Sequence, residues 1–506
     1  MIPACTLLLF FLPASTHAAN TPDGKEKPNV LFIAVDDLKP LLGCYGDPLA
    51  KTPNIDRLAA QGTVFNRAYC MQAVCSPSRN SVMTGLRPEV LQIYDLSTHF
   101  RLRAPEVVTL PQYFKQQGWQ SQALGKLYHV GHGNIDDTHS WSVPHFKPKA
   151  KPYLLPENQP SKEDVARQQA RRKKNPAVTG AKGAAYENAD VGDDAYHDGK
   201  ITTEAVKRLK QFKQDGTPFF LAIGYIRPHL PFNAPQKYWD MHDPARITLA
   251  DRDTPPDGAP AFAPQFGGEL RAYAGIQKEG ALPADVQRKL IHGYYAATSY
   301  MDAQVGRLLD ELNALGLQEN TIIVLWGDHG WHLGDHGMWC KHTNYEQATR
   351  SPLIISAPGK NKKQTTQALT EFVDIYPTLC ELAGLELPKH LGGTSLIPYL
   401  DNANAESKPA AFQVYPRSRP ETGPMLGHAV RTDHWRYVEW QKKDGSIAAT
   451  ELYDMQTDPG ETKNMAADSA NAAIVKEHHD LLTNRLQTPL PEGLKLVELK
   501  KAGKKK

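Results

Sequence analysis

Two short apolar runs that lie far apart in the chain both end in acidic residues, and this pairing constrains the fold more than any other feature. The first run spans 29–35 and leads into Asp36 and Asp37; the second spans 321–325 and leads through Trp326 and Gly327 into Asp328. Apolar, β-branched runs of this length are typical of parallel strands buried on both faces. Ligands of such sheets bind beyond the carboxyl ends of the strands. We therefore expect the two acidic clusters to lie together.

The rest of the chain alternates between strand-like and helix-like segments. Further strands are expected over 121–124, 218–224 and 352–357, and helices over 109–118, 201–212 and 286–315. This alternation predicts an α/β domain with a large, mostly parallel sheet sandwiched by helices. From about Leu385 the pattern changes to shorter strands, including 429–440, which predicts a smaller C-terminal α+β subdomain.

These patterns predict the domain organisation. The α/β domain is expected over 27–384 and contains a surface insertion at 147–192 that is rich in Pro, Lys, Gln and Arg and has a possible substrate-facing role. The C-terminal subdomain is expected over 385–490, and a basic tail over 491–506.

The composition argues for an enzyme-sized globular protein and against a nucleic-acid binder. The chain has 506 residues, 41% of them hydrophobic and 22% charged, and a formal net charge of +3. Five lysines within 500–506 supply more than that excess, so the body is slightly negative. Affinity for an anionic ligand must then come from a few local cations.

The N-terminus has the pattern of a signal peptide. An apolar run, Leu7 to Leu12, precedes small residues ending near Ala19, which predicts a signal peptide over 1–19 and export to the periplasm or medium. No other stretch has the roughly 20 apolar residues that a membrane span needs, so no transmembrane segment is expected. Cleavage would remove Cys5 and leave five cysteines. An odd number in an exported protein indicates a thiol with another role.

The most specific motif is Cys75-Ser76-Pro77-Ser78-Arg79. A cysteine at a helix start, with proline in the first turn and arginine one turn on, places a nucleophile beside an anion site. Helix-terminal N–H groups and a guanidinium together hold a tetrahedral oxyanion. A lone cysteine at a helix start is usually buried packing, and the complete pentapeptide is what favours the catalytic interpretation.

This pentapeptide and several further motifs resemble those of the type I, formylglycine-dependent sulfatases of the alkaline phosphatase superfamily, with most likeness to the iduronate-2-sulfatase members. The likeness reaches from about Lys27 to about Met465. It includes the segments 35–38, 43–46, 52–56, 125–129, 224–232, 328–330, 333–337 and 451–454. So many matches in one order are hard to produce by chance. The resemblance implies an alkaline phosphatase-like fold.

A metal site is expected at the acidic clusters. Three carboxylates brought together without a cation would repel one another, and calcium prefers such oxygen ligands. The resemblance implies one Ca²⁺ held by Asp36, Asp37, Asp328, His329 and the converted Cys75. Many sulfatases have asparagine at this position, whereas this chain has His329, and the iduronate-type members have histidine as well. Histidine suits transition metals too, so the identity of the ion stays open.

The resemblance also implies the catalytic groups. Cys75 becomes 3-oxoalanine (formylglycine) through a formylglycine-generating or anaerobic sulfatase-maturating enzyme, and its hydrate is the nucleophile. Arg79, Lys126 and Lys341 bind the sulfate oxygens, His229 protonates the leaving oxygen, and His129 removes a proton from the second hydroxyl. The expected substrate contacts are His99, Arg101 and Trp331.

The expected activity is removal of sulfate from a sulfated sugar, such as a 2-O-sulfated uronic acid or a related polysaccharide fragment. Two alternatives stay open. The same scaffold suits a phosphate or phosphonate monoester hydrolase, although the second set of Asp and His ligands of two-metal phosphatases is not found in the sequence. A non-catalytic sulfated-glycan binder results if Cys75 is never oxidised.

Overall fold

The computed structural model describes residues 26–175, 178 and 180–499. The expected signal peptide and the lysines of 500–506 lie outside these residues. No helix in the described ranges is long and apolar enough to cross a membrane. All five cysteines of the described chain are free thiols.

The core of the molecule is a large sheet whose strand order is β3-β5-β1-β7-β8-β2-β9. Its strands are β1 (Asn29–Val35), β2 (Thr63–Tyr69), β3 (Gln120–Gly125), β5 (Phe219–Tyr225), β7 (Thr321–Gly327), β8 (Leu353–Ser356) and β9 (Gln364–Glu371). All neighbours pair in parallel except β8, which is antiparallel to both β7 and β2. The predicted large, mostly parallel sheet is confirmed.

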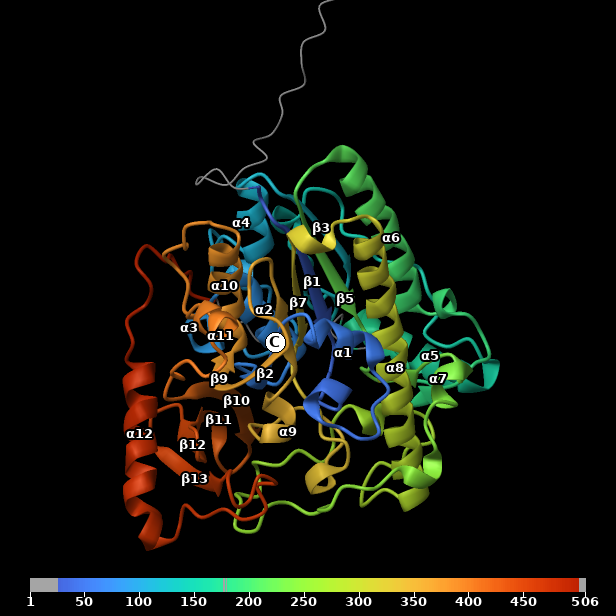
Figure 1. Cartoon of the computed structure of the whole chain (residues 1–506). Helices are drawn as coiled ribbons and strands as arrows, with labels where there is room; N and C mark the ends of the chain where they lie inside the picture. The colour runs from blue at the N-terminus through green and yellow to red at the C-terminus, as the bar shows by residue number, and fades with distance from the viewer. Residues whose placement is uncertain (1–25, 176–177, 179, 500–506) are drawn as a thin grey trace, which may run out of the picture.

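Helices cover both faces of this sheet (Figure 1). On one face pack α2 (Cys75–Thr84), α4 (Leu110–Gln116), α10 (Ile375–Leu382) and α11 (Ile397–Asp401); on the other pack α1 (Pro53–Ala59), α6 (His197–Asp215) and α8 (Ala284–Ala314). In β1, Val30, Phe32 and Ala34 point to the first layer, whereas the intervening residues point to the second. Both faces of the strand are thus buried, which explains its uninterrupted apolar sequence.

The smaller subdomain is an antiparallel sheet of β10 (Ala411–Arg419), β11 (Gly423–Arg431), β12 (Trp435–Lys442) and β13 (Ile447–Asp454). Helix α12 (Ala472–Leu486) packs against it through Leu482, next to Val430 and Tyr437. The segment 429–440, expected as strand, spans the end of β11, a turn and most of β12. Residues 385–401 pack with the core of the large sheet rather than with this subdomain.

The remaining elements are short or lie at the surface. They are α3 (Pro88–Leu91), α5 (Lys162–Lys174), α7 (Gln236–Trp239), α9 (Glu346–Thr349) and the paired strands β4 (Tyr186–Glu187) and β6 (Phe232–Asn233). Helix α5 lies within the expected insertion 147–192 and buries none of its residues. Within the expected tail, Val497 donates a backbone hydrogen bond to the Arg103 carbonyl at 2.7 Å, and Leu494 and Leu496 pack on the main core.

A buried ion-pair group ties the end of α2 to the edge of the sheet. Arg87, just beyond α2, donates two hydrogen bonds of 2.6 Å to Glu371 at the end of β9. Lys408 donates to the same carboxylate at 2.7 Å and to Asp374 at 2.6 Å. Burial opposes ionisation of Glu371, but Arg87 and Lys408 hold its pKa well below the ordinary value. This group helps to fix the position of α2 and therefore of Cys75.

We predict that Glu371→Gln lowers the free energy of unfolding by about 3–5 kcal/mol at neutral pH, because it leaves Arg87 and Lys408 buried without their shared counter-charge. Since the folded-state pKa of Glu371 is depressed, its contribution is present above the unfolded carboxyl pKa of about 4.3 and is lost as the pH falls through the folded value. Urea unfolding at several pH values measures both effects.

The matched control is Glu204→Gln on α6, whose ion pair with Arg208 is partly exposed to solvent and is expected to contribute less than about 1 kcal/mol. A loss in Glu371→Gln no larger than in this control would contradict the structural role of the Arg87–Glu371 pair.

Candidate active site

The candidate site lies where the carboxyl ends of four parallel strands meet the start of α2. Asp36 and Asp37 follow β1, Asp328 and His329 follow β7, Lys126 follows β3, and the loop containing His229 follows β5. Gly224 in β5 allows this convergence, because a Cβ atom there would lie 2.0 Å from the carbonyl oxygen of Lys126. The two acidic clusters expected from the sequence therefore lie side by side.

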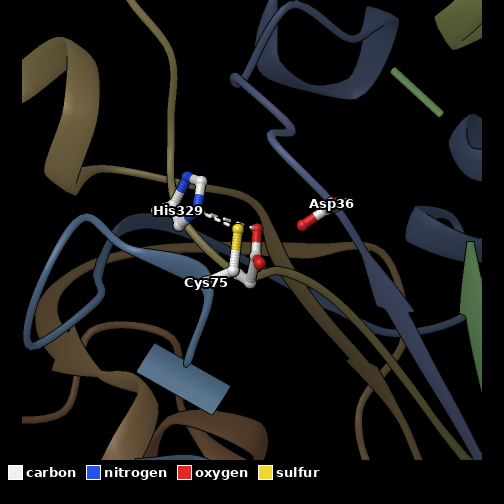
Figure 2. A group of neighbouring side chains, drawn as sticks. Asp36, Cys75 and His329 are labelled. Atoms are coloured by element: carbon white, nitrogen blue, oxygen red, sulfur yellow. Dashed lines mark hydrogen bonds and ion pairs between the residues drawn. The ribbon is translucent and has the colours of Figure 1, made fainter. Parts of the chain in front are cut away.

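The Cys75 thiol lies inside the carboxylate group. Figure 2 shows its sulfur beside the His329 ring, with Asp36 facing the same space. The His329 Nε2 atom is 3.4 Å from Cys75 Sγ. Ligand atoms of Asp36, Cys75, Asp328 and His329 all lie within 4.8 Å of one another. These four residues are almost completely buried, so the group is shielded from water.

Three cations surround these carboxylates. Arg79 contacts Asp328 through Nε at 2.9 Å and Asp36 through Nη2 at 3.2 Å. Lys126 donates to the second oxygen of Asp36, and Lys341 contacts both oxygens of Asp37 at 2.9 and 3.1 Å. The structure thus brings Arg79, Lys126 and Lys341 to one place, although they come from three separate parts of the chain.

The surroundings change the acidities of these groups. Burial opposes ionisation of Asp36, but Lys126, His229 and Arg79 hold its pKa well below the ordinary value. Burial and the charge of Asp36 raise the pKa of Asp37 to about 7, against the effect of Lys341. Burial, helped by the Asp36 charge, also raises the pKa of the Cys75 thiol well above its ordinary value. The unmodified cysteine is therefore protonated and is a poor nucleophile.

The donor set fits a hard divalent cation. Asp36, Asp37 and Asp328 offer carboxylate oxygens, which calcium and magnesium prefer. The Nδ1 atom of His329 lies 3.0 Å from the Gly330 carbonyl oxygen, to which it donates. This contact leaves the Nε2 lone pair directed at Cys75 and the carboxylates, as a metal ligand requires.

Two further histidines lie at the site. His229 Nδ1 is 2.6 Å from the Leu230 carbonyl oxygen, and its Nε2 is 3.3 Å from Glu269. His129 Nε2 is 2.9 Å from His132 Nδ1. Within the described chain, His129 Nδ1 is buried without a hydrogen-bond partner. Burial and the charge of Lys126 lower the pKa of His129 to about 2, so this ring is neutral.

A cavity of about 500 Å³ adjoins the site. Asp36, Lys126, His129 and His229 lie on its wall. The rest of the lining combines apolar residues, such as Leu230 and Pro231, with the cationic or titratable residues Lys147, Lys151, His197 and Arg227. Lys147 and Lys151 belong to the insertion 147–192. The insertion therefore forms part of the wall of the cavity rather than lying wholly outside it.

The three expected substrate contacts lie in less open positions. Arg101 donates to both oxygens of Asp137, at 2.6 and 2.9 Å, and also to Gln112 and two backbone carbonyls. His99 accepts the backbone N–H of Arg101 at 3.3 Å. Trp331 is 1% exposed, and the Lys341 ammonium lies 5.1 Å from its ring centroid. These contacts favour structural roles for Arg101 and Trp331.

Sequence reasoning missed two charged residues at the site. Glu269 directly follows the Pro/Gly-rich loop 251–268 and contacts His229 at 3.3 Å and Lys341 at 3.2 Å. Lys182 lies in the insertion, and its charge acts on Glu269 and on His132. Both lie in loops without periodicity, so only their charge and their proximity to expected motifs offered a signal.

Comparisons with known proteins place the chain in a family. The sequence model described as Sulfatase matches residues 28–385, and one described as N-sulphoglucosamine sulphohydrolase, C-terminal, matches residues 334–488. The iduronate 2-sulfatase of Homo sapiens is 33% identical over 538 residues, covering 90% of this chain and 94% of that protein. A delta 4,5-hexuronate-2-O-sulfatase of Bacteroides thetaiotaomicron is 27% identical over 472 residues, covering 90% of this chain and 88% of that protein.

Solved structures agree with these matches. A 2-O GAG sulfatase superposes with a TM-score of 0.68 and 26% identity, covering 91% of this chain and 92% of that one. The phosphonate monoester hydrolase of Agrobacterium radiobacter superposes with a TM-score of 0.70 and 22% identity, covering 91% and 96%, and this likeness concerns the fold alone. Because one family model spans most of the residues and a relative above 30% identity aligns along nearly the whole length, the chain belongs to the sulfatase family and is a sulfatase.

Proposed function

We propose that this sulfatase removes a sulfate ester from a sugar, specifically a 2-O-sulfated uronic acid or a related polysaccharide fragment, using formylglycine made from Cys75 and one Ca²⁺. The observation that carries the proposal is the position of Cys75. It is the first residue of α2, its thiol is buried among three carboxylates and His329, and Arg79, Lys126 and Lys341 surround the same space.

The protonated thiol supports the proposed modification. With its pKa raised by burial, Cys75 as such has little thiolate to attack a sulfate ester. Hydrated formylglycine would supply two hydroxyls on one carbon, one to attack sulfur and one whose deprotonation releases the sulfate. A calcium ion held by Asp36, Asp37, Asp328 and His329 would supply positive charge that acidifies the attacking hydroxyl.

The cations of the site bind the sulfate group in this proposal. Arg79, Lys126 and Lys341 come from α2, from the loop after β3 and from the loop after β7, so they approach the same anion from different sides. Each already contacts a carboxylate, which fixes its position before the substrate arrives. Such preorganised cations oppose the negative charge that develops on the sulfuryl oxygens during transfer.

His229 is the proposed proton donor to the leaving sugar oxygen. Its Nδ1–H donates to the Leu230 carbonyl, so the proton for the leaving oxygen must come from Nε2, which faces the site. Burial lowers the pKa of His229 to about 4, and the carboxylate of Glu269 opposes this shift. The negative charge of a bound sulfate ester acts in the same direction as Glu269 and favours the protonated ring.

His129 is the proposed base for the second hydroxyl. It is neutral at ordinary pH, it lies on the cavity wall beside Lys126, and its buried Nδ1 lacks a partner in the described chain. Taking a proton there would restore the aldehyde and expel sulfate. An ester of serine or unmodified cysteine has no second hydroxyl, and this gives the modification its chemical purpose.

The proposed substrate class rests on the relatives and on the cavity. Similar proteins are an iduronate 2-sulfatase and a hexuronate-2-O-sulfatase. The cationic wall formed by Lys147, Lys151 and Arg227 suits an anionic sugar. The proposal also includes export directed by the N-terminal segment 1–19. It further includes maturation of Cys75 by a formylglycine-generating or anaerobic sulfatase-maturating enzyme.

We predict that a screen of defined sulfated mono- and disaccharides gives the highest kcat/KM with a 2-O-sulfated uronic acid, with released sulfate as the readout. Matched aryl sulfate and aryl phosphate or phosphonate esters separate the proposal from the phosphoryl alternatives. Faster turnover of the phosphorus esters would assign the chain to that chemistry, and binding of sulfated sugars without any turnover would indicate a glycan binder.

We predict that Cys75→Ala lowers kcat by roughly 10³-fold or more while leaving the fold intact, because the nucleophile is lost. Circular dichroism and released sulfate measure the two properties. The control is Cys380→Ala, which also removes a buried thiol but lies in α10 and should stay active. Mass spectrometry of the wild-type Cys75 peptide tests conversion to the aldehyde; a fully active alanine variant or an unmodified, active cysteine would refute this role.

We predict that removing divalent ions with EGTA abolishes activity and lowers the Tm, and that Ca²⁺ restores both. A ligand at 100 times its Kd stabilises the folded state by about 2.7 kcal/mol. Asp328→Asn should remove the calcium-dependent shift in Tm. Asp302→Asn, which alters a buried carboxylate hydrogen-bonded to the start of α1, should keep that shift. Restoration by Mn²⁺ or Zn²⁺ but not by Ca²⁺ would contradict the assigned ion.

A further inference from the structure

Lys182 differs from the other cations near the active site in its charge balance. Arg79 contacts Asp36 and Asp328, Lys126 contacts Asp36, and Lys341 contacts Asp37 and Glu269. In the part of the chain that the structure describes, no carboxylate contacts Lys182. Among the described residues its ammonium contacts only Tyr273, with the hydroxyl at 3.4 Å and the ring centroid at 5.1 Å.

The contact with Tyr273 places Lys182 near the cavity that adjoins the site. Tyr273 packs in the same apolar cluster as Leu230, which lines that cavity, and Trp331, whose ring lies 5.1 Å from the Lys341 ammonium. Burial and the positive charges of Lys341 and Lys126 lower the pKa of Lys182, while Glu269 raises it. The groups that affect it are therefore those that surround the sulfate position. A half-buried ammonium with only one weak acceptor has lost part of its hydration without gaining a counter-charge. An anionic ligand group beside it would supply that charge.

Glu269 is the carboxylate whose charge acts on Lys182, but its oxygens have other partners. Oε1 lies 3.3 Å from His229 Nε2, and Oε2 lies 3.2 Å from Lys341 Nζ. Glu269 is therefore already paired with His229 and Lys341, the residues proposed to act on the ester itself. Lys182 is left with donor capacity that no protein carboxylate uses in the described residues.

The backbone around Lys182 is held firmly, unlike that of an ordinary surface lysine. The next two residues are hydrogen-bonded on both sides. The Ala274 N–H donates to the Gly183 carbonyl at 2.9 Å, which connects the insertion to the body of the protein, and the Ala184 N–H donates to the Asn158 carbonyl within the insertion at 2.9 Å. A Cβ atom at Gly183 would lie 2.0 Å from the Asn158 oxygen. This close packing fixes where the ammonium can reach, as a recognition residue requires.

We propose that Lys182 binds a second anionic group on the sugar that carries the scissile sulfate, either a carboxylate or a second sulfate. The inference rests on the proposed function and assigns a specificity role to the C-terminal end of the insertion. In this arrangement Lys126 and Lys341 bind the scissile sulfate, and Lys182 binds the second anionic group of the same sugar.

The test compares Lys182→Met with the wild type on matched substrates. They are a 2-O-sulfated uronic acid, a disulfated hexosamine, and a neutral hexose with one sulfate. We expect kcat/KM to fall by about 10- to 100-fold on each sugar whose second anionic group binds Lys182, because a charge-assisted hydrogen bond is lost. The loss should be confined to sugars with that second charge. Comparison of the uronic acid with the disulfated sugar shows whether Lys182 binds a carboxylate or a second sulfate. Lys182→Arg should restore part of the preference for doubly charged sugars.

The control is Lys207→Met, which removes an exposed cation of α6 and should leave all three rates unchanged. An equal loss on all three sugars would mean that Lys182 acts on the reacting sulfate or on the fold, and no loss on any would remove its role; either result overturns the inference.

A separate measurement distinguishes failure of this inference from failure of the proposed function. Calorimetric titration of Cys75→Ala, with and without Lys182→Met, by the same sugars reports binding without turnover. If the wild type hydrolyses none of the esters, the sulfate-ester proposal fails, while a Lys182-dependent preference for doubly charged sugars in this titration would still support the inference. Equal affinities in the two proteins would overturn it.

Discussion

The mutual repulsion of Asp36, Asp37 and Asp328 is the constraint on which the rest of the site depends. Three carboxylates at the ends of β1 and β7, all nearly inaccessible to water, are stable together only when positive charge lies between or around them. Arg79, Lys126 and Lys341 provide that charge from three other segments. In the proposed function the same cations also bind the sulfate group, so stabilisation of the acidic cluster and binding of the substrate would use the same side chains.

Much of the fold could be predicted because burial on both faces leaves a clear sequence pattern. β1 covers the expected 29–35, and β3, β5, β7 and β8 lie within two residues of their expected positions. β2 and β9 were missed. β2 contains Asn66 and Arg67, and β9 begins with four polar residues, 364–367, at the sheet edge, so neither presents an apolar run. The antiparallel direction of β8 depends on tertiary pairing and has no local signal.

The candidate site was predictable where its residues follow strands or belong to motifs, and less so elsewhere. Asp36, Asp37, Cys75, Asp328 and His329 meet as expected because strand ends and a helix start determine their positions. Arg101 is engaged by Asp137, a partner that only the folded structure identifies. Glu269 and Lys182 come from loops whose paths are set by packing against distant residues. Patterns of polarity along a chain carry little information about such loops.

The pairing of β1 with β7 has a consequence for the order of events during synthesis. Asp37 and Asp328, which meet through a 3.0 Å hydrogen bond, are separated by 291 positions. Contacts between such distant segments form slowly, and here they cannot begin until the ribosome has made the later strand. During that interval the segment around residue 75 lacks its contacts with Asp328 and His329. For the proposed conversion of Cys75, the long span between the two strands therefore sets how much time is available before the side chain is buried.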